Sequence, residues 1–73
     1  MGEAIETYCE DGEWRNRMRG REPLPGTYGG QAAAVEVGRD EARIRGVAHV
    51  IRRIDGTVAE RNRYPRRSGE IPG

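Results

Sequence analysis

The chain has 73 residues, of which 34% are hydrophobic and 34% are charged, and its formal net charge is +1. This length fits a single domain, and a net charge so close to zero does not indicate a nucleic-acid binder. So short a chain buries a thin core, which favours a disulfide, a metal ion or a partner subunit as an additional source of stability. One cysteine and one histidine exclude an internal disulfide and argue against a structural zinc site. A homodimer is therefore favoured over a monomer.

The first predicted element is a β-hairpin around Asp11-Gly12. A tight two-residue turn needs positive φ at both central positions, which Asp tolerates and Gly adopts freely. The turn is predicted to join a strand over about 4–10 to one over about 13–19. Side chains alternate between the two faces of a strand. The second strand therefore presents two different faces. Trp14, Asn16 and Met18 share one face, and Arg15, Arg17 and Arg19 share the other.

Residues 20–30 contain two prolines and four glycines and are predicted to form a loop. The following segment, 31–46, is rich in Ala, Arg and Glu and is the only predicted helix. Its small residues recur with helical spacing, which predicts close packing on a sheet. These residues are Ala34, Val35, Gly38 and Ala42. Gly46 suits the C-terminal cap of the helix, whereas no residue with a capping side chain precedes it.

Residues 47–54 are largely apolar and β-branched and are predicted to form a central strand. Asp55-Gly56 then predicts a second turn, and 57–64 the last strand. The predicted fold is α+β, a ββαββ domain over residues 1–64. One helix covers a four-stranded, mostly antiparallel sheet, and residues 65–73 form a flexible basic tail. The residues predicted to carry the fold are Trp14, Met18, Val35, Ile51 and Val58.

Several of these segments resemble a small bacterial and phage family called "domain of unknown function 2188". The clearest similarity is His49-Val50-Ile51 followed by Asp55-Gly56-Thr57-Val58 and Glu60-Arg61-Asn62-x-Tyr64. Weaker similarity includes Glu10-Asp11-Gly12-x-Trp14, Gly20, Ala32-x-Ala34-Val35 and Gly38-Arg39. The resemblance covers about residues 5–64 and implies the ββαββ fold. It implies no activity, and so no catalytic residues.

No group of residues in the sequence has the pattern of an active site, a metal site or a cofactor site. His49 is the only histidine, and it is more simply a partly buried strand residue bonded to a neighbour than a general base. Cys9 has acidic sequence neighbours, which disfavour a reactive thiolate. The acidic residues around Gly12 lack calcium-loop spacing, and the glycines of 26–30 lack the lysine of a phosphate-binding loop. We therefore predict no enzymatic activity, no cofactor and no small-molecule ligand.

The arginines are the strongest functional signal, because guanidinium groups bind carboxylate or phosphate in pairs. The predicted contact residues are Arg15, Arg17, Arg19, Arg61, Arg63, Tyr64, Arg66 and Arg67. Two functions remain open. The favoured one is a non-enzymatic interaction domain that associates with itself or docks on another protein. The alternative is a small nucleic-acid-binding module in which Tyr64 stacks on a base. A surface neutralised by the protein's own glutamates is a further explanation of the arginines, and the near-zero net charge favours it over nucleic-acid binding.

The composition also suggests a compartment and a source. No apolar run is long enough to span a membrane, and the acidic start lacks a signal-peptide pattern. A cytoplasmic location is therefore predicted. All 13 basic residues are Arg and none is Lys, which is typical of a GC-rich genome and predicts a high-GC bacterium or its phage.

Overall fold

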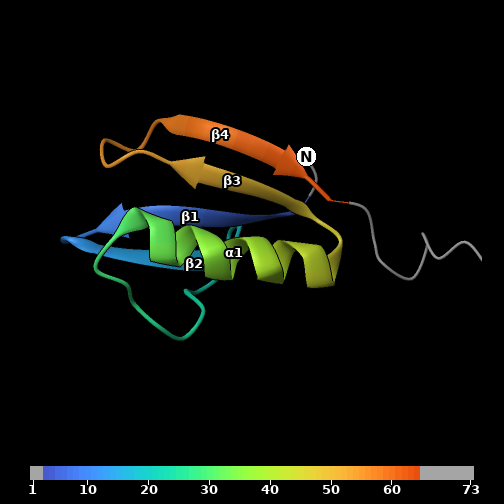
Figure 1. Ribbon diagram of the computed structural model, residues 1–73, viewed down its shortest axis with the longest axis horizontal. Helices are drawn as coiled ribbons and strands as arrows, with labels where there is room; N and C mark the ends of the chain where they lie inside the picture. The colour runs from blue at the N-terminus through green and yellow to red at the C-terminus, as the bar shows by residue number, and fades with distance from the viewer. Residues whose placement is uncertain (1–2, 65–73) are drawn as a thin grey trace, which may run out of the picture.

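The computed structural model describes residues 3–64, and the predicted tail over 65–73 lies outside this range. The elements follow the predicted ββαββ order. They are β1 (Ala4–Glu10), β2 (Glu13–Met18), α1 (Gln31–Arg45), β3 (Ala48–Arg52) and β4 (Val58–Arg63). The four strands form one sheet in the order β2-β1-β3-β4, with the helix packed against one side of it (Figure 1).

The sheet is mixed, because its two central strands run parallel. β1 pairs with β3 in parallel, with Glu6 beside Val50 and Thr7 beside Ile51. The two outer pairings, β1 with β2 and β3 with β4, are antiparallel hairpins. The helix connects the hairpins, so residues far apart in the sequence meet in the middle of the sheet.

The two Asp-Gly turns have different geometries. In the first hairpin Asp11 has φ 53° and Gly12 has φ 80°, the positive values that a two-residue turn of this kind requires. In the second, only Gly56 has positive φ, at 93°. Asp55 instead accepts hydrogen bonds from the backbone N–H of Thr57 at 2.9 Å and from its hydroxyl at 2.7 Å. The second turn is thus held by a side chain, as in other Asx turns.

The helix lies close to the sheet because its inner surface is made of small residues. Ala34, Gly38 and Ala42 are buried, and α1 contacts β1, β2 and β3. Gly30 precedes the helix without a side-chain cap, as the sequence suggests. At the other end Gly46 adopts φ 69°, and the N–H of Val47 donates to the carbonyl of Ala42 at 3.0 Å. This left-handed glycine ends the helix in the way its sequence predicts.

The predicted core is partly correct. Trp14 and Ile51 are buried, whereas Met18 and Val35 are half-buried. Val58 is 42% exposed, so its assignment to the core was wrong. The reason is its position at the start of β4, the edge strand that lies farthest from the helix (Figure 1). The buried apolar residues are Ala4, Ile5, Trp14, Ala34, Ala42, Val50 and Ile51.

Candidate functional site: the open face of the sheet

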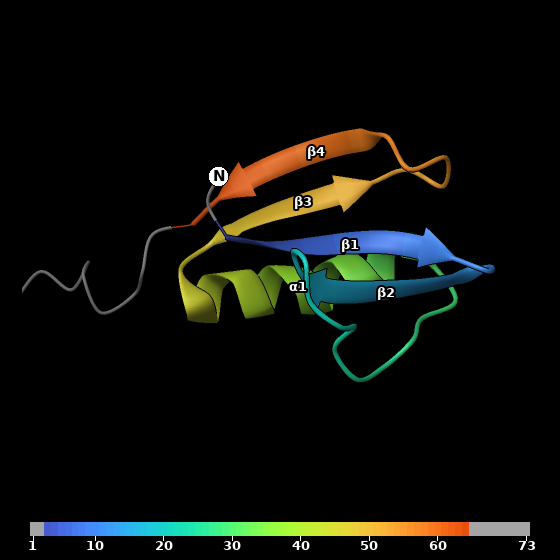
Figure 2. The same ribbon diagram turned by 180° about the vertical axis from the view of Figure 1, so that it is seen from behind.

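The side of the sheet that faces away from α1 carries a row of arginines. Strand register places Arg17 beside Glu6, Glu6 beside Val50, and Val50 beside Arg61. Directly paired residues point to the same face, so these side chains form one row across all four strands. Figure 2 views the molecule from behind, where β1 and β2 lie in front of the helix. We call this surface the open face.

Glu6 is the centre of the open face. Glu6 is only 3% exposed, and its carboxylate accepts hydrogen bonds from three guanidinium groups. Arg17 donates at 2.9 Å, Arg52 at 3.0 Å and Arg19 at 3.4 Å. Burial by itself raises the pKa of Glu6, but the hydrogen bonds and positive charges of Arg52 and Arg17 together hold it below its ordinary value of 4.5. Glu6 is therefore an ionised anchor for three cations.

Arg17 is held by two contacts, a hydrogen bond and an aromatic ring. Its Nε bonds Glu6, and its guanidinium carbon lies 4.6 Å from the centre of the Tyr8 ring. Such a cation–π contact and a charged hydrogen bond together fix the plane of the guanidinium. Within residues 3–64 its two terminal amino groups have no hydrogen-bond partner, and its side chain is 38% exposed. Arg17 therefore presents a rigid pair of donors to the solvent.

The structure separates the predicted contact residues into several groups. Arg17 and Arg19 bond Glu6, while Arg15 forms a 3.5 Å ion pair with Glu13. Arg61 and Arg63 lie on the open face of β4, and neither forms an ion pair with another described residue. Arg66 and Arg67 lie outside the described residues.

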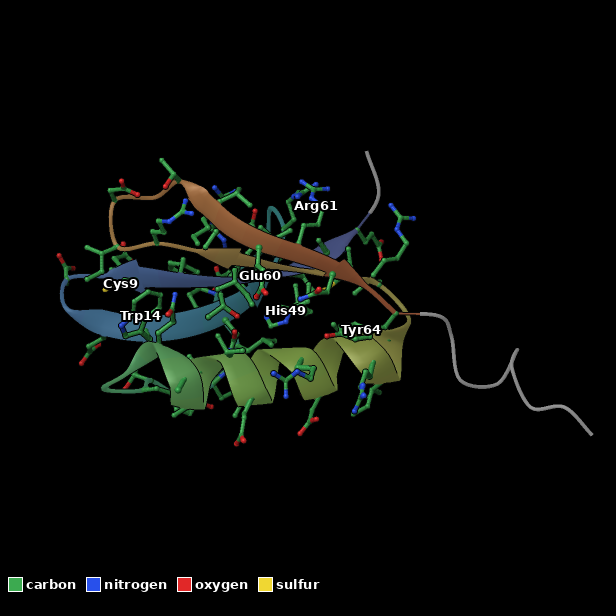
Figure 3. All side chains as sticks on the ribbon, turned by 45° about the horizontal axis from the view of Figure 1, so that its top comes forward. Cys9, Trp14, His49, Glu60, Arg61 and Tyr64 are labelled. Carbon is green, nitrogen blue, oxygen red and sulfur yellow. The ribbon has the colours of Figure 1, made fainter. Side chains whose placement is uncertain are left out.

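Tyr64 does not lie among the arginines of the open face. Figure 3 shows its ring on the helix side of the sheet, while Arg61 projects on the other side of β4. The ring lies beneath the guanidinium of Arg43 from α1, 5.5 Å from centroid to carbon. Tyr64 therefore fastens the end of the last strand to the helix.

Sequence reasoning missed the residues that organise the open face. Glu6 and Tyr8 alternate with Ile5 and Thr7 along β1, so period two places them opposite the core residue Ile5. That alternation was the available signal. Arg52 carried no such signal, because its approach to Glu6 depends on the pairing of β1 with β3, which joins residues 46 positions apart.

The helix side holds a second polar group, buried between β1, β2, β3 and Gly38. The Thr7 hydroxyl donates to the Asn16 Oδ1 at 2.5 Å, and the Asn16 Nδ2 donates to the carbonyl of Ala34 at 3.0 Å. A hydroxyl has one proton, so its 2.7 Å contact with the Nε2 of His49 requires the histidine to donate. The three side chains thus form a directed chain of hydrogen bonds that ends on the backbone of α1.

His49 is neutral within this chain. Its Nδ1 is buried and has no partner among residues 3–64, so a proton placed there would be a buried, unbonded charge. Burial lowers the pKa of His49 below its ordinary value of 6.5, and the charge of Arg39 lowers it further. The residue is completely buried, more deeply than the sequence suggests, and its hydrogen bond to Thr7 is the predicted bond to a neighbour. Its geometry gives it a structural role in joining β3 to β1.

Other candidate chemistry is sparse in the described part of the chain. No group of three or more potential metal ligands occurs there, and Cys9 is half-buried with a free thiol. The helix of residues 3–64 is too short and too polar to cross a lipid bilayer. The open face, with its anchored guanidinium groups, is therefore the candidate site.

Comparison with known protein families identifies the family of this chain. Residues 5–64 match the model of the family described as "Uncharacterized protein conserved in bacteria (DUF2188)". Neither the search of curated proteins nor that of solved structures found a significant match. The matched range exceeds half of the 73 residues and includes the helix and all four strands except Ala4, the first residue of β1. The chain therefore belongs to this uncharacterised bacterial family.

Proposed function

We propose that the protein is a non-enzymatic interaction domain whose open face binds an acidic segment of a partner protein. The observation that carries the proposal is the arrangement of three guanidinium groups around the single buried carboxylate of Glu6. An interior carboxylate that fixes the orientation of Arg17 through its Nε leaves the two terminal amino groups of Arg17 ready for a second carboxylate. Such pre-organisation reduces the conformational entropy lost on binding.

The local charge supports an anionic partner. Arg17 and Arg52 together carry two positive charges, and Glu6 supplies one negative charge. Their side chains are 38% and 28% exposed, so an incoming group can reach them. A carboxylate matches the planar, two-donor end of Arg17 and would bind it with two parallel hydrogen bonds.

An acidic protein segment fits this surface better than nucleic acid does. Affinity for nucleic acid rests largely on unneutralised positive charge, and the whole chain has a net charge of only +1. Single-strand binders also use aromatic rings as stacking platforms. The ring of Tyr8 is occupied by Arg17, and that of Tyr64 packs under Arg43 on the helix side. The arginines of the open face thus lack a free aromatic neighbour among the described residues.

A titration with defined probes tests the proposal. The probes are a labelled Glu-rich peptide, single-stranded DNA, double-stranded DNA and RNA, each at low and moderate salt. We expect the peptide to bind, and Arg17→Ala to weaken that binding about tenfold, a typical loss for a well-placed charged hydrogen bond. Arg45→Ala is the matched control, because Arg45 pairs with Glu41 on the helix, in the other layer of the domain.

The same titration also identifies the competing functions. Tighter binding of DNA or RNA than of the peptide, lost in Arg17→Ala, would replace the proposal with nucleic-acid recognition. Equal binding by the Arg17 and Arg45 variants would exclude the open face as the site. Light scattering on the free protein measures its mass, and a dimer would make a second copy of the chain one of its partners, as the thin core suggests.

A further inference from the structure

The two edge strands of the sheet, β2 and β4, differ in whether another segment of the chain pairs with their outer side. Along β2, the loop over 19–30 pairs with the strand: Trp14 and Tyr28 exchange two backbone hydrogen bonds of 2.9 Å, and the N–H of Leu24 donates to the carbonyl of Asn16 at 2.8 Å. Pro23 also lies in this covering segment, opposite Arg17. Proline and a covering loop are common means of protecting an edge strand from other chains. The β2 edge is therefore closed.

The β4 edge is open along most of its length. β4 pairs only with β3, and in residues 3–64 no backbone group pairs with its outer side. The carbonyl of Val58 accepts a hydrogen bond from the side chain of Arg53 at 3.0 Å, which occupies only the beginning of the strand. Five of its six residues are exposed. Unpaired N–H and C=O groups in such a row are a template for another strand.

The charges of β4 oppose its pairing with a second copy of itself. If two copies of β4 paired about a two-fold axis perpendicular to the sheet, every side chain would stay on its own face. Each residue would then lie opposite the same residue of the second copy or one an even number of positions away. The two registers with the longest overlap are centred on Glu60 and on Arg61. The first places two glutamates opposite each other and the second two arginines, and like charges in directly opposed positions are destabilising.

The same charges favour a different partner strand. Arg61 and Arg63 project from the open face of β4, and neither has an ion-pair partner in the described part of the chain. A neighbouring strand with acidic side chains on that face would place carboxylates opposite or diagonal to both guanidinium groups. We propose that β4 accepts an extended acidic segment of a partner protein as a fifth strand of the sheet. This inference rests on the proposed function and specifies how the partner's backbone is held.

Backbone methylation of a peptide probe tests strand addition directly. The probe alternates Glu with Val, so that its carboxylates share one face when it is extended. In a strand, successive N–H groups point to opposite edges. Only every second amide of the peptide can therefore bond β4. We prepare one peptide N-methylated at the Glu positions and one at the Val positions. Strand addition predicts that one of them loses binding by about tenfold or more and the other keeps it.

Charge exchange tests the predicted register of side chains. Arg61→Glu combined with Arg63→Glu should abolish binding of the Glu-Val peptide and confer binding of the equivalent Lys-Val peptide. Arg21→Glu combined with Arg45→Glu makes the same change of charge away from β4, in the loop beside β2 and on α1, and should leave the preference for the Glu-Val peptide in place. Both experiments use the full chain, with hydrogen exchange of the β4 amides as a second measurement.

The results distinguish the two proposals. If the Glu-Val peptide binds and depends on Arg17, but both methylated peptides bind equally, the open face binds acidic side chains and strand addition is wrong. If one methylated peptide alone loses binding and the β4 amides become protected, strand addition is correct whatever the effect of Arg17→Ala. If no peptide binds, both proposals fail.

Discussion

The backbone of Gly38 in α1 lies directly against the side chain of His49 in β3. A Cβ atom at Gly38 would lie 2.7 Å from the Nε2 of His49, 2.7 Å from the Thr7 hydroxyl and 2.6 Å from the Asn16 amide oxygen. Glycine is usually unfavourable inside a helix, by about 1 kcal/mol relative to alanine. Here it allows the helix to approach the three hydrogen-bonded side chains, so close packing outweighs helix propensity.

Gly38→Ala is therefore expected to destabilise the domain despite its better helix propensity. The new methyl group must displace side chains held in a buried hydrogen-bond chain, and overpacking of this kind costs about 1–3 kcal/mol. Urea unfolding measures the change in free energy. Gly29→Ala is the control, because no atom lies within 4 Å of its Cβ position, and it should change stability by less than about 0.5 kcal/mol. A more stable Gly38→Ala variant would contradict the packing described above.

Thr7→Val is expected to destabilise the domain while keeping its volume nearly unchanged. The substitution removes the acceptor of the His49 Nε2 proton and the donor to Asn16, and leaving buried polar groups unbonded costs about 1–3 kcal/mol each. Thr7→Ser keeps the hydroxyl and is the control. If valine and serine had equal effects in urea unfolding, the hydrogen bonds would be irrelevant to stability.

The stability of the domain should fall as the pH drops through 6.5. The pKa of His49 is lowered in the folded state, so below pH 6.5 the unfolded chain binds a proton that the folded chain excludes. The contribution is fully present above the ordinary pKa of 6.5 and is lost progressively below it. Unfolding midpoints measured across this range, for the wild type and for His49→Gln, check the sign. A wild-type stability that rose on acidification in this window would refute the neutral, buried histidine.

Glu6→Gln is expected to destabilise the sheet by about 1–3 kcal/mol, because three arginines lose their shared negative charge. The lower value applies if solvent screens the partly exposed guanidinium groups. The pKa of Glu6 is lowered in the folded state, so this contribution persists above pH 4.5 and disappears on further acidification. Glu36→Gln on the exposed side of α1 is the control, and thermal unfolding at two salt concentrations measures the difference.

The same substitution should act differently in the two Asp-Gly turns. Asp11→Gly replaces a residue with φ 53° by one that adopts positive φ readily, so stability should be almost unchanged. Asp55→Gly removes both hydrogen bonds to Thr57 and should lower the unfolding temperature. Thermal unfolding of the two variants provides the comparison. A larger loss at Asp11 than at Asp55 would mean that the turns are stabilised in some other way.

Local pattern was sufficient to predict most of the fold. The first hairpin, the small inner surface of α1 and the glycine at its end all depend on residues close together in the sequence. The position of Val58 was not predictable in this way, because apolar character does not reveal that β4 is an edge strand beyond the helix. The parallel pairing of β1 with β3 likewise depends on the whole topology.

The candidate site was only half predictable for the same reason. Alternation along β2 predicted that Arg15, Arg17 and Arg19 share a face. It did not predict that Glu6 and Arg52 join them, since that requires the two hairpins to meet. The chain from His49 through Thr7 to Asn16 also draws one residue from each of β3, β1 and β2. Sites assembled across strands become visible only once the strand order is known.

The parallel junction of β1 and β3 also has a kinetic consequence. Each hairpin finds its central neighbour only in the other half of the chain, so neither half can complete a sheet by itself. Acquisition of the native structure must therefore wait for a long loop to close, which slows a small protein relative to an all-helical one of equal size. We expect a single cooperative folding transition, and fragments divided within the helix should remain unstructured until they are mixed.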